Sequence, residues 1–430
     1  TSLTLNYDLG WAALTSSSSW FKEDSARNTD LSIFVNFPWS QFLGREADVF
    51  VEEIRLVSQH DGPLQFLAGI YYEDIENNFE VINTYAGDPT LNPESELVLI
   101  SLNEEAPVTQ KALFGEISYQ FSNMLALTVG ARFFDYEKGQ SSLSAGPFAG
   151  AAPGETILVA SDTEETGNTG KINLAYTANE DLLLYAQWSE GFRLGKSQVS
   201  LPSNICDTNG NGLVDGTNLP IGLDSTDPDT LESFEIGAKY TGLDGRLQLN
   251  SSVFHNNWDG IPVEVIGDDP VCRISANAGN AETKGIELEG TYFISDTFRL
   301  DMGISYTDAE LTEDVASLGA ESGDRLPGSP RFNANLALQN SFTIAEHNAF
   351  IRADYIWVGG SHSDLQEQTP EAGDFGLLNV KLGTQLDNIL VELYVKNLTG
   401  KDDLSYWNSG FSAGTRLRPR TAGFDISVQF

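Results

Sequence analysis

The stretch with the clearest capacity for chemistry is a run of oxygen-bearing side chains between Asp207 and Asp215, with the sequence Asp-Thr-Asn-Gly-Asn-Gly-Leu-Val-Asp. Side-chain oxygens stand at positions 1, 3, 5 and 9, glycine stands at position 6, and position 7 offers a backbone carbonyl, as in calcium loops. Position 12 is an asparagine instead of the usual bidentate glutamate, so we expect a reduced affinity for Ca²⁺. The alternative is an acidic, turn-rich loop that binds no ion tightly. The predicted ligands within 207–218 are Asp207, Asn209, Asn211, Leu213, Asp215 and Asn218.

The two cysteines of the chain lie close to this loop. Cys206 directly precedes it, and Cys272 lies in the next long polar segment. Because the two segments are expected at the same end of neighbouring hairpins, we predict a disulfide, which implies an oxidising compartment. In the chain-entropy model such a bridge stabilises the fold by roughly 4 kcal/mol. Two free thiols are the alternative.

Catalytic chemistry has little support in the sequence. The four histidines are scattered among turns, loops and one strand, and neither a nucleophile–base arrangement nor zinc-ligand spacing is present. We therefore predict no enzymatic activity and no organic cofactor. The histidines are His60, His255, His347 and His362.

The elements that must position the loop are segments of alternating apolar and polar residues, as in 247–253, 286–292 and 391–396. Alternation gives a strand one apolar and one polar face. A lysine or arginine facing lipid at mid-membrane costs about 2–4 kcal/mol, so the charged face is expected to line an interior. A soluble sandwich would bury the apolar face against a second sheet. Very short links such as Leu243-Asp244-Gly245 alternate with long polar ones, and this regularity favours a barrel over a sandwich.

About seventeen such strands are expected, with eight long links between them. Short turns and long loops lie at opposite ends of an outer-membrane barrel, so the long loops are expected outside and the carboxyl terminus in the periplasm. Because single-chain bacterial barrels close with an even number of strands, we expect further strands amino-terminal to Thr1, which has neither a Met nor a signal segment before it. The long links are 22–48, 77–110, 138–170, 192–230, 259–282, 308–330, 359–374 and 398–420.

Composition agrees with a membrane barrel and excludes some partners. No run of the chain approaches the ~18–20 apolar residues of a membrane helix. The formal net charge of −38 argues against binding to nucleic acid, because phosphates would be repelled. The same charge is compatible with divalent cations, cationic ligands or a saline environment.

Several motifs resemble those of a known family. The closing stretch 421–430, which ends on Phe430, is similar to the final strand of outer-membrane barrels. The stretches 188–193, with Ser-Glu-Gly-Phe-Arg, and 395–401, with Asn-Leu-Thr-Gly-Lys, resemble strand-end motifs of the TonB-dependent receptors. The Pro-Arg-Thr of 419–424 resembles the start of their last strand. The segment 53–72 resembles a mid-barrel hairpin of the iron-complex subfamily.

This resemblance implies an all-β fold, an antiparallel transmembrane β-barrel in which residues 1–430 supply about 17 strands of a 22-stranded barrel. The plug domain that fills such barrels, the TonB-binding segment and about five first strands are absent from this chain and are expected in a longer parent protein. The implied function is active uptake of a scarce nutrient, by default a ferric siderophore or other iron complex, with carbohydrate or cobalamin left open. A passive porin and a calcium-ordered adhesion or structural barrel are the alternatives.

The resemblance also implies a location and partners. The location is the outer membrane of a Gram-negative bacterium, and the partners are membrane lipid and lipopolysaccharide, the TonB complex, and the barrel-insertion machinery that reads the last strand. The cargo is a small molecule or metal complex whose binding residues the sequence does not reveal. Aromatic residues near strand ends are predicted to form interfacial belts, and some could instead contact the cargo. They are Trp20, Phe21, Tyr71, Tyr72, Trp188, Phe192, Trp258, Trp357 and Trp407.

Overall fold

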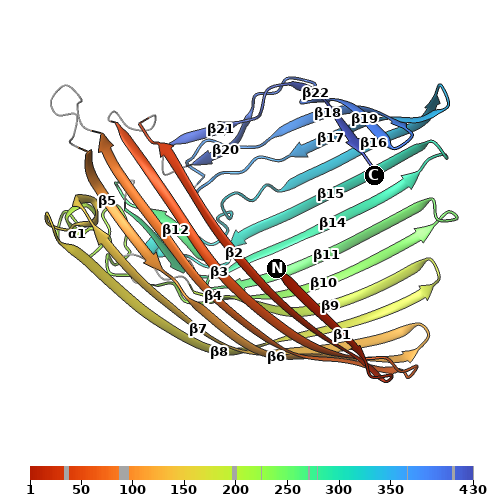
Figure 1. The fold of residues 1–430 in the computed structure, drawn as a ribbon, viewed down its shortest axis with the longest axis horizontal. Coiled ribbons are helices and arrows are strands. Elements are labelled where there is room, and N and C mark those ends of the chain that lie inside the picture. Colours follow the sequence, from red (N-terminus) through yellow and green to blue (C-terminus); the bar gives the residue numbers. More distant parts are fainter. Residues whose placement is uncertain are drawn as a thin grey trace.

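The structure, a computed structural model, describes residues 1–430 except 33–37, 87–95, 196–200, 224, 270–271, 278, 366, 409–411 and 430. One strongly bent antiparallel sheet accounts for most of the described chain (Figure 1). None of the described helical segments, each of three or four residues, could cross a membrane. The strands of this sheet are β1 (Ser2–Asp8), β2 (Ala12–Asp30), β3 (Trp39–Ser58), β4 (Leu64–Ala86), β5 (Glu96–Glu105), β6 (Val108–Ser122), β7 (Leu125–Ala145), β8 (Thr156–Asn179), β9 (Leu182–Arg193), β10 (Asp229–Gly242), β11 (Leu247–Asp259), β14 (Ala281–Phe293), β15 (Phe298–Leu311), β16 (Phe332–Ile344), β17 (His347–Val358), β18 (Phe375–Leu386), β19 (Ile389–Lys396) and β22 (Thr421–Val428).

Smaller elements lie in the connections at one end of this sheet. They are η1 (Pro147–Ala149), α1 (Ser203–Cys206), η2 (Ala316–Leu318), the hairpin of β12 (Pro262–Ile266) and β13 (Arg273–Asn277), and the hairpin of β20 (Leu404–Asn408) and β21 (Ala413–Arg416). We call this the long-loop end, and the opposite end the short-turn end.

Strands follow one another in the sheet in chain order, with one exception. β5 and β6 occupy the same place between β4 and β7: β5 pairs with β4 over Asn78–Ala86, and β6 pairs with β4 over Leu64–Ile75. Ala106-Pro107 separates them, and proline cannot donate to the ladder because it lacks an N–H. The sheet of eighteen strands therefore has seventeen places, which confirms the predicted number.

Two margins remain at the edges of this sheet. In the described chain β1 pairs only with β2, and β22 pairs only with β19. Because the seventeen places alternate in direction, the two margins run parallel to each other. Figure 1 shows the resulting shape, a deep trough with β1 and β22 at its two sides.

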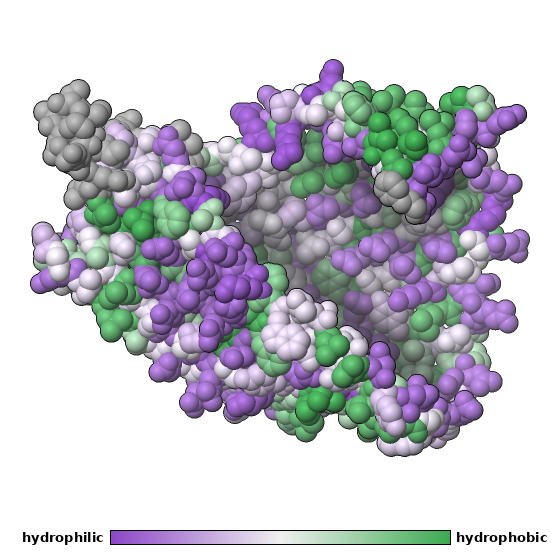
Figure 2. All heavy atoms as spheres, viewed as in Figure 1, coloured by the Kyte–Doolittle hydropathy of each residue, from purple (hydrophilic) through white to green (hydrophobic). Residues whose placement is uncertain are grey.

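The two faces of the sheet differ as the alternation predicts. Ile70, Leu113 and Phe133 are directly opposite one another on β4, β6 and β7, and each is more than half exposed. The neighbouring row on the other face contains Ala112 and Phe134, which are buried. The exposed apolar rows lie on the convex face and the polar rows line the hollow, which Figure 2 shows between the two walls.

Paired charges line this hollow. Arg299, Asp301, Arg352 and Asp354 form a chain of contacts across β15 and β17, with Arg352 Nη1 2.9 Å from Asp301 Oδ2 and Arg352 Nε 2.8 Å from Asp354 Oδ1. A lysine–glutamate pair, Lys381–Glu392 at 3.2 Å, continues the pattern on β18 and β19. The charged strand face therefore lies inward, as predicted.

The short turns also match the sequence. Leu243, Asp244 and Gly245 have φ values of 56°, 56° and 79° between β10 and β11. A left-handed backbone over three residues is costly for a non-glycine side chain, and it is tolerated at a hairpin where the twist requires it. The predicted tight turn is confirmed.

Three of the predicted long links are wrong, because they are largely strand. The range 22–48 contains the ends of β2 and β3, 77–110 contains parts of β4, β5 and β6, and 138–170 contains parts of β7 and β8. These strands extend well past the apolar rows. There both faces carry polar residues, so the alternation that identifies a strand is lost while the backbone ladder continues.

Candidate functional site

Four connections at the long-loop end pack into one body, which we call the cap. It comprises 201–228, 259–281, 312–330 and 359–374. One buried cluster joins Cys206, Val214, Leu219, Cys272 and Ile274. A second cluster contains Ile261, Leu311, Val315, Leu326 and Leu365, and Leu318 packs against both. The cap therefore has an apolar core of its own.

A disulfide ties two of these connections together. Cys206 and Cys272 are bonded, with their Cα atoms 5.5 Å apart, and both are essentially inaccessible to solvent. The bond joins α1 to the start of β13 inside the first cluster. The predicted disulfide is confirmed.

The predicted calcium loop follows α1 directly. Both carboxylate oxygens of Asp207 accept backbone N–H groups, from Asn211 at 2.9 Å and from Gly212 at 3.0 Å. Asp215 accepts from the Asn209 amide at 2.7 Å. It also accepts the backbone N–H and the hydroxyl of Thr208, and these bonds lower the pKa of Asp215 below its usual value. The two carboxylates of the loop thus accept hydrogen bonds from donors of the same loop.

The remaining predicted ligands are arranged less uniformly. Asn211 Oδ1 accepts the backbone N–H of Leu213 at 2.8 Å, and Asn218 donates its amide to the carbonyl of Ala316 at 3.1 Å. In the described part of the chain, no group of three or more His, Cys, Asp or Glu side chains could hold a metal. The loop would rely on asparagine and carbonyl oxygens instead, so the calcium site stays a prediction.

A buried carboxylate joins the ends of β9, β10 and β11 next to the cap. Asp229, only 4% exposed, accepts from Arg193 Nε at 3.0 Å and from the indole N–H of Trp258. The Arg193 guanidinium lies 4.7 Å from the Trp258 ring centroid, so the same arginine also makes a cation–π contact. Sequence reasoning placed Trp258 in an interfacial belt, and it gave no indication of its pairing with Asp229.

Arginine and aromatic side chains meet on the inner wall beside the cap. Arg132 lies over Tyr71 at 4.9 Å and over Phe114 at 5.9 Å from the ring centroids. One residue pair further along β7, Phe134 stacks on Phe192 with centroids 3.7 Å apart. Flat apolar faces beside a cation suit a planar or chelated ligand.

This wall also fixes the start of the longest cap connection. Tyr136 is buried, stacks near Phe192 and donates its hydroxyl to Glu165 at 2.8 Å. Lys138 Nζ donates to the carbonyl of Gly195 at 2.7 Å. The stacking of Tyr136 near Phe192 and the bond from Lys138 to Gly195 hold residues 192–195 against β7. The rings of Tyr71 and Phe192 therefore belong to the inner wall and not to a belt facing lipid.

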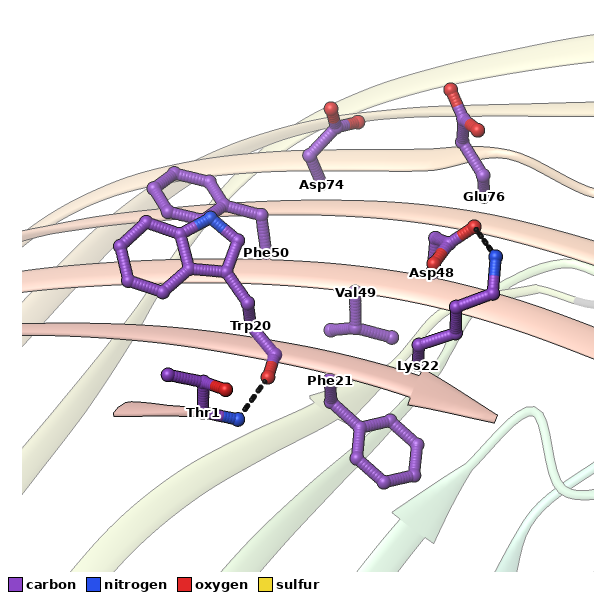
Figure 3. Close-up of a pocket in the computed structure, with 9 residues that line it drawn as sticks. All are labelled: Thr1, Trp20, Phe21, Lys22, Asp48, Val49, Phe50, Asp74 and Glu76. Carbon is purple, nitrogen blue, oxygen red and sulfur yellow. Dashed lines mark hydrogen bonds and ion pairs between the residues drawn. The ribbon is translucent and has the colours of Figure 1, made fainter. Parts of the chain in front are cut away.

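The outer face carries a different aromatic group. Trp20 and Phe50 have ring centroids 5.3 Å apart, and Phe50 lies 6.2 Å from Tyr72. Figure 3 shows Trp20 and Phe50 on the same side of the sheet, with Phe21 pointing to the other side. Next to them Lys22 pairs with Asp48 at 3.1 Å. Charges therefore also occur on the outer face beyond the apolar rows, which the sequence pattern did not predict.

A cleft of about 660 Å³ opens between the four cap connections. Apolar groups from Val263, Val265 and Leu365 line it, together with the carboxylates of Glu264 and Asp364. The Asp364 carboxylate accepts the backbone N–H groups of Gln368 and Thr369 and the Thr369 hydroxyl. Partial burial raises the pKa of Asp364, but these hydrogen bonds outweigh it and lower the pKa overall.

The four histidines occupy separate places. His60 accepts the N–H of Gly62 in a short turn, His255 lies on β11 3.9 Å from Glu282, and His347 begins β17. His362 bonds the carbonyl of Thr369 at 2.7 Å in the cap. No pair of them is brought together. The carboxyl-terminal Phe430, predicted to be part of an insertion signal, lies outside the described residues.

Comparison with known proteins gives consistent matches along the chain. The model for "TonB dependent receptor-like, beta-barrel" matches residues 1–398. The ferrioxamine B receptor of Salmonella typhimurium is 26% identical over 58% of the chain and 32% of its own length. The pesticin receptor of Yersinia pestis is 21% identical over 96% of the chain and 55% of its own length.

Solved structures give the same picture of the fold. The ferric yersiniabactin uptake receptor of Yersinia pestis superposes with a TM-score of 0.79 at 16% identity, over 100% of this chain and 60% of that chain. The siderophore receptor PiuA of Acinetobacter baumannii gives 0.71 at 15% identity, over 99% of this chain and 63% of that one. The chain spans about half or less of the length of the curated relatives that it matches.

Proposed function

This chain belongs to the TonB-dependent receptor-like β-barrel family, and we propose from that premise that it is the barrel of an active transport receptor in the outer membrane. Its cargo is a scarce nutrient, by preference a ferric siderophore or another iron complex, and TonB supplies the energy. The single observation that carries the proposal is the family match over 1–398. A relative that is by name a receptor for ferrioxamine B supports an iron complex as the cargo.

The parent protein is proposed to be longer than 1–430. The parallel margins β1 and β22 can be joined through antiparallel pairing only by an odd number of additional strands. About five strands before Thr1, preceded by a plug domain and a TonB-binding segment, meet that requirement and complete a 22-stranded barrel. The polar, ion-paired inner wall suits contact with such a plug, because buried charges need partners.

Orientation and partners follow from the barrel architecture. The cap is proposed to face the outside, and the carboxyl terminus at the short-turn end to face the periplasm. The convex apolar rows contact lipid, and lipopolysaccharide surrounds the strands above them. The barrel-insertion machinery is proposed to bind β22, which offers a free edge in the described chain.

Other functions remain as outcomes of the test. A passive porin would need no TonB, and an adhesion or structural barrel would transport nothing. Carbohydrate and cobalamin receptors would depend on TonB but not import iron. The four cap connections packed over one end of the hollow favour a gated receptor over an open pore.

The test compares uptake in cells with and without the full parent gene, each in the presence and absence of TonB. We expect radioactive iron to enter from at least one ferric complex only when both genes are present. Uptake that persists without TonB would indicate a porin. Normal uptake of every iron complex without the parent gene would overturn the proposal, and matched assays with cobalamin and oligosaccharides would then identify the cargo.

A further inference from the structure

The four connections of the cap have an unusual charge. Each of the ranges 201–228, 259–281, 312–330 and 359–374 carries four acidic residues. Within these ranges lysine is absent, and the only basic residues other than His362 are Arg273 and Arg325; Lys196 precedes the first range. The acidic residues are Asp207, Asp215, Asp224, Asp227, Asp259, Glu264, Asp268, Asp269, Glu313, Asp314, Glu321, Asp324, Asp364, Glu367, Glu371 and Asp374.

Both arginines are already engaged by acids of the cap itself. Arg273 Nη1 lies 3.0 Å from Glu264 Oε1. Arg325 Nη1 lies 3.7 Å from Glu367 Oε1, and Arg325 also donates to the carbonyl of Ser329 at 2.6 Å. The cap therefore has sixteen acidic residues to two arginines, a formal excess of fourteen negative charges.

The inner wall below the cap is different. There several acids have basic partners, as in Lys171–Glu116 at 3.0 Å and the Arg352–Asp301 contact. The cap carries 14 of the chain's 38 net negative charges on 86 of its 430 residues, so negative charge is denser in the cap than in the rest of the chain. A strong field across low-dielectric walls changes association rates of charged ligands by about 10–10³-fold.

The field of the cap is also fixed in place. The disulfide and the two shared apolar clusters hold its four connections as one body, so the carboxylates cannot easily move away from an approaching anion. The cleft of about 660 Å³ lies within this body, and lysine and arginine are absent from the described residues that line it. Apolar groups and carboxylates together suit an organic ligand that carries no net negative charge.

We propose that the cap is an electrostatic filter, which speeds the capture of cationic metal complexes, accepts neutral ones and repels polyanionic ones. The inference rests on the proposed transport function and narrows its cargo to a charge class. It predicts that the sign of the charge on a ferric complex, at constant coordination chemistry, decides how fast the receptor binds it.

The experiment uses the purified full-length parent receptor and two ferric trihydroxamates that differ at one site. One is a linear complex with a free pendant ammonium, and the other is the same complex with that ammonium succinylated, so that it ends in a carboxylate. Association rates are measured by stopped-flow quenching of tryptophan fluorescence at about 0.02 M and 0.5 M NaCl. We expect the cation to bind at least about 10-fold faster at low salt, and the difference to shrink at high salt as screening shortens the Debye length.

Two matched triple variants distinguish the effect of charge in the cap from the effect of the total charge of the protein. Asp227→Asn, Glu321→Gln and Glu371→Gln neutralise three exposed cap acids whose described hydrogen bonds, where there are any, involve only the backbone. Glu180→Gln, Asp244→Asn and Asp296→Asn make the same change in net charge at the short-turn end. We expect the first set to slow the cation several-fold at low salt and the second set to leave its rate unchanged.

Equal rates for the two complexes, a faster anion, or equal effects of the two variant sets would each overturn the filter. The uptake assay in cells is read separately. Uptake of polyanionic iron complexes only would overturn the filter and leave the transport function intact. Normal uptake without the parent gene would overturn transport itself. Uptake restricted to cationic or neutral complexes would support both.

Discussion

The cap and the inner wall of the sheet hold their side chains in position by different means. The cap has a disulfide, two apolar clusters and a surplus of carboxylates. The inner wall has no such cluster of comparable extent among its described residues, and its order comes from the backbone ladder and from paired charges such as Arg352–Asp301. The cap should therefore lose its structure when a few contacts are removed. The sheet should keep its structure, because many backbone hydrogen bonds stabilise it.

Under the proposed transport function, this difference matters because a ligand would meet the two regions one after the other. A ligand entering from the long-loop end passes the carboxylates of the cap before it reaches Arg132 and the rings beside it. Long-range charge affects the association rate. The close contacts of the wall form later and affect the lifetime of the complex.

The largest expected effect comes from removing the disulfide. In the Cys206→Ser/Cys272→Ser receptor the cap should lose about 4 kcal/mol of stability, because a 66-residue loop is no longer closed in the unfolded state. Limited proteolysis should then cut within 201–228, while the heat-induced gel shift of the barrel stays the same. A barrel that unfolds together with the cap would contradict the independence of the two regions.

A smaller effect is expected from breaking a pair on the inner wall. Arg352→Ala leaves Asp301 and Asp354 without their shared partner at side-chain exposures of 18% and 33%, and should cost about 2 kcal/mol. The control is Lys22→Ala on the outer face, where the side chains of the pair are 69% and 54% exposed and no measurable loss of stability is expected. Urea unfolding of both variants in lipid vesicles measures the difference in their losses of stability. Equal losses would contradict the expected difference between the inner and the outer ion pair.

Calcium is expected to stabilise the cap and to leave the stability of the inner wall unchanged. At ten times its Kd, Ca²⁺ should add about 1.4 kcal/mol to the cap, as expected for one site occupied only in the folded state. Titration calorimetry of the receptor and of Asp207→Ala tests this. Identical heats from the two proteins would reject the site in 207–218.

The smallest effect is a pH dependence of the cap. Hydrogen bonds lower the pKa of Asp364, so its contribution to stability is complete above the ordinary carboxyl pKa and is lost as the pH falls through the lowered value. We expect amide exchange at Gln368 and Thr369, corrected for intrinsic rates, to increase as the pH falls below about 4. Asp364→Asn should abolish the pH dependence, and an unchanged profile in that variant would assign it to another group.

Much of the sheet is predictable because a membrane imposes a strict rule. Each strand segment within the apolar rows alternates, and a turn such as Leu243-Asp244-Gly245 has few conformations available, so strand number, turn position and inward charge all follow from the residues. The disulfide is predictable for a related reason. Once the strands are placed, Cys206 and Cys272 can lie only at the same end of neighbouring hairpins.

The rest depends on contacts that no local pattern records. β2, β4 and β8 continue into polar sequence, where only the neighbouring strand defines them. The apolar residues of the cap, such as Val315 and Leu365, are isolated in the sequence and form a core only when four connections meet. Likewise, nothing near Trp258 indicates that its partner is Asp229, 29 residues earlier.

The bond between Cys206 and Cys272 also constrains biogenesis. It joins the outer connections of two successive hairpins, β9–β10 and β11–β14, within a cluster from which solvent is excluded. With the cap facing outward, bacterial thiol oxidation takes place on the opposite side of the membrane, in the periplasm. From the proposed orientation we therefore expect the two connections to be joined before they are translocated, so that these hairpins enter the bilayer as one cross-linked unit.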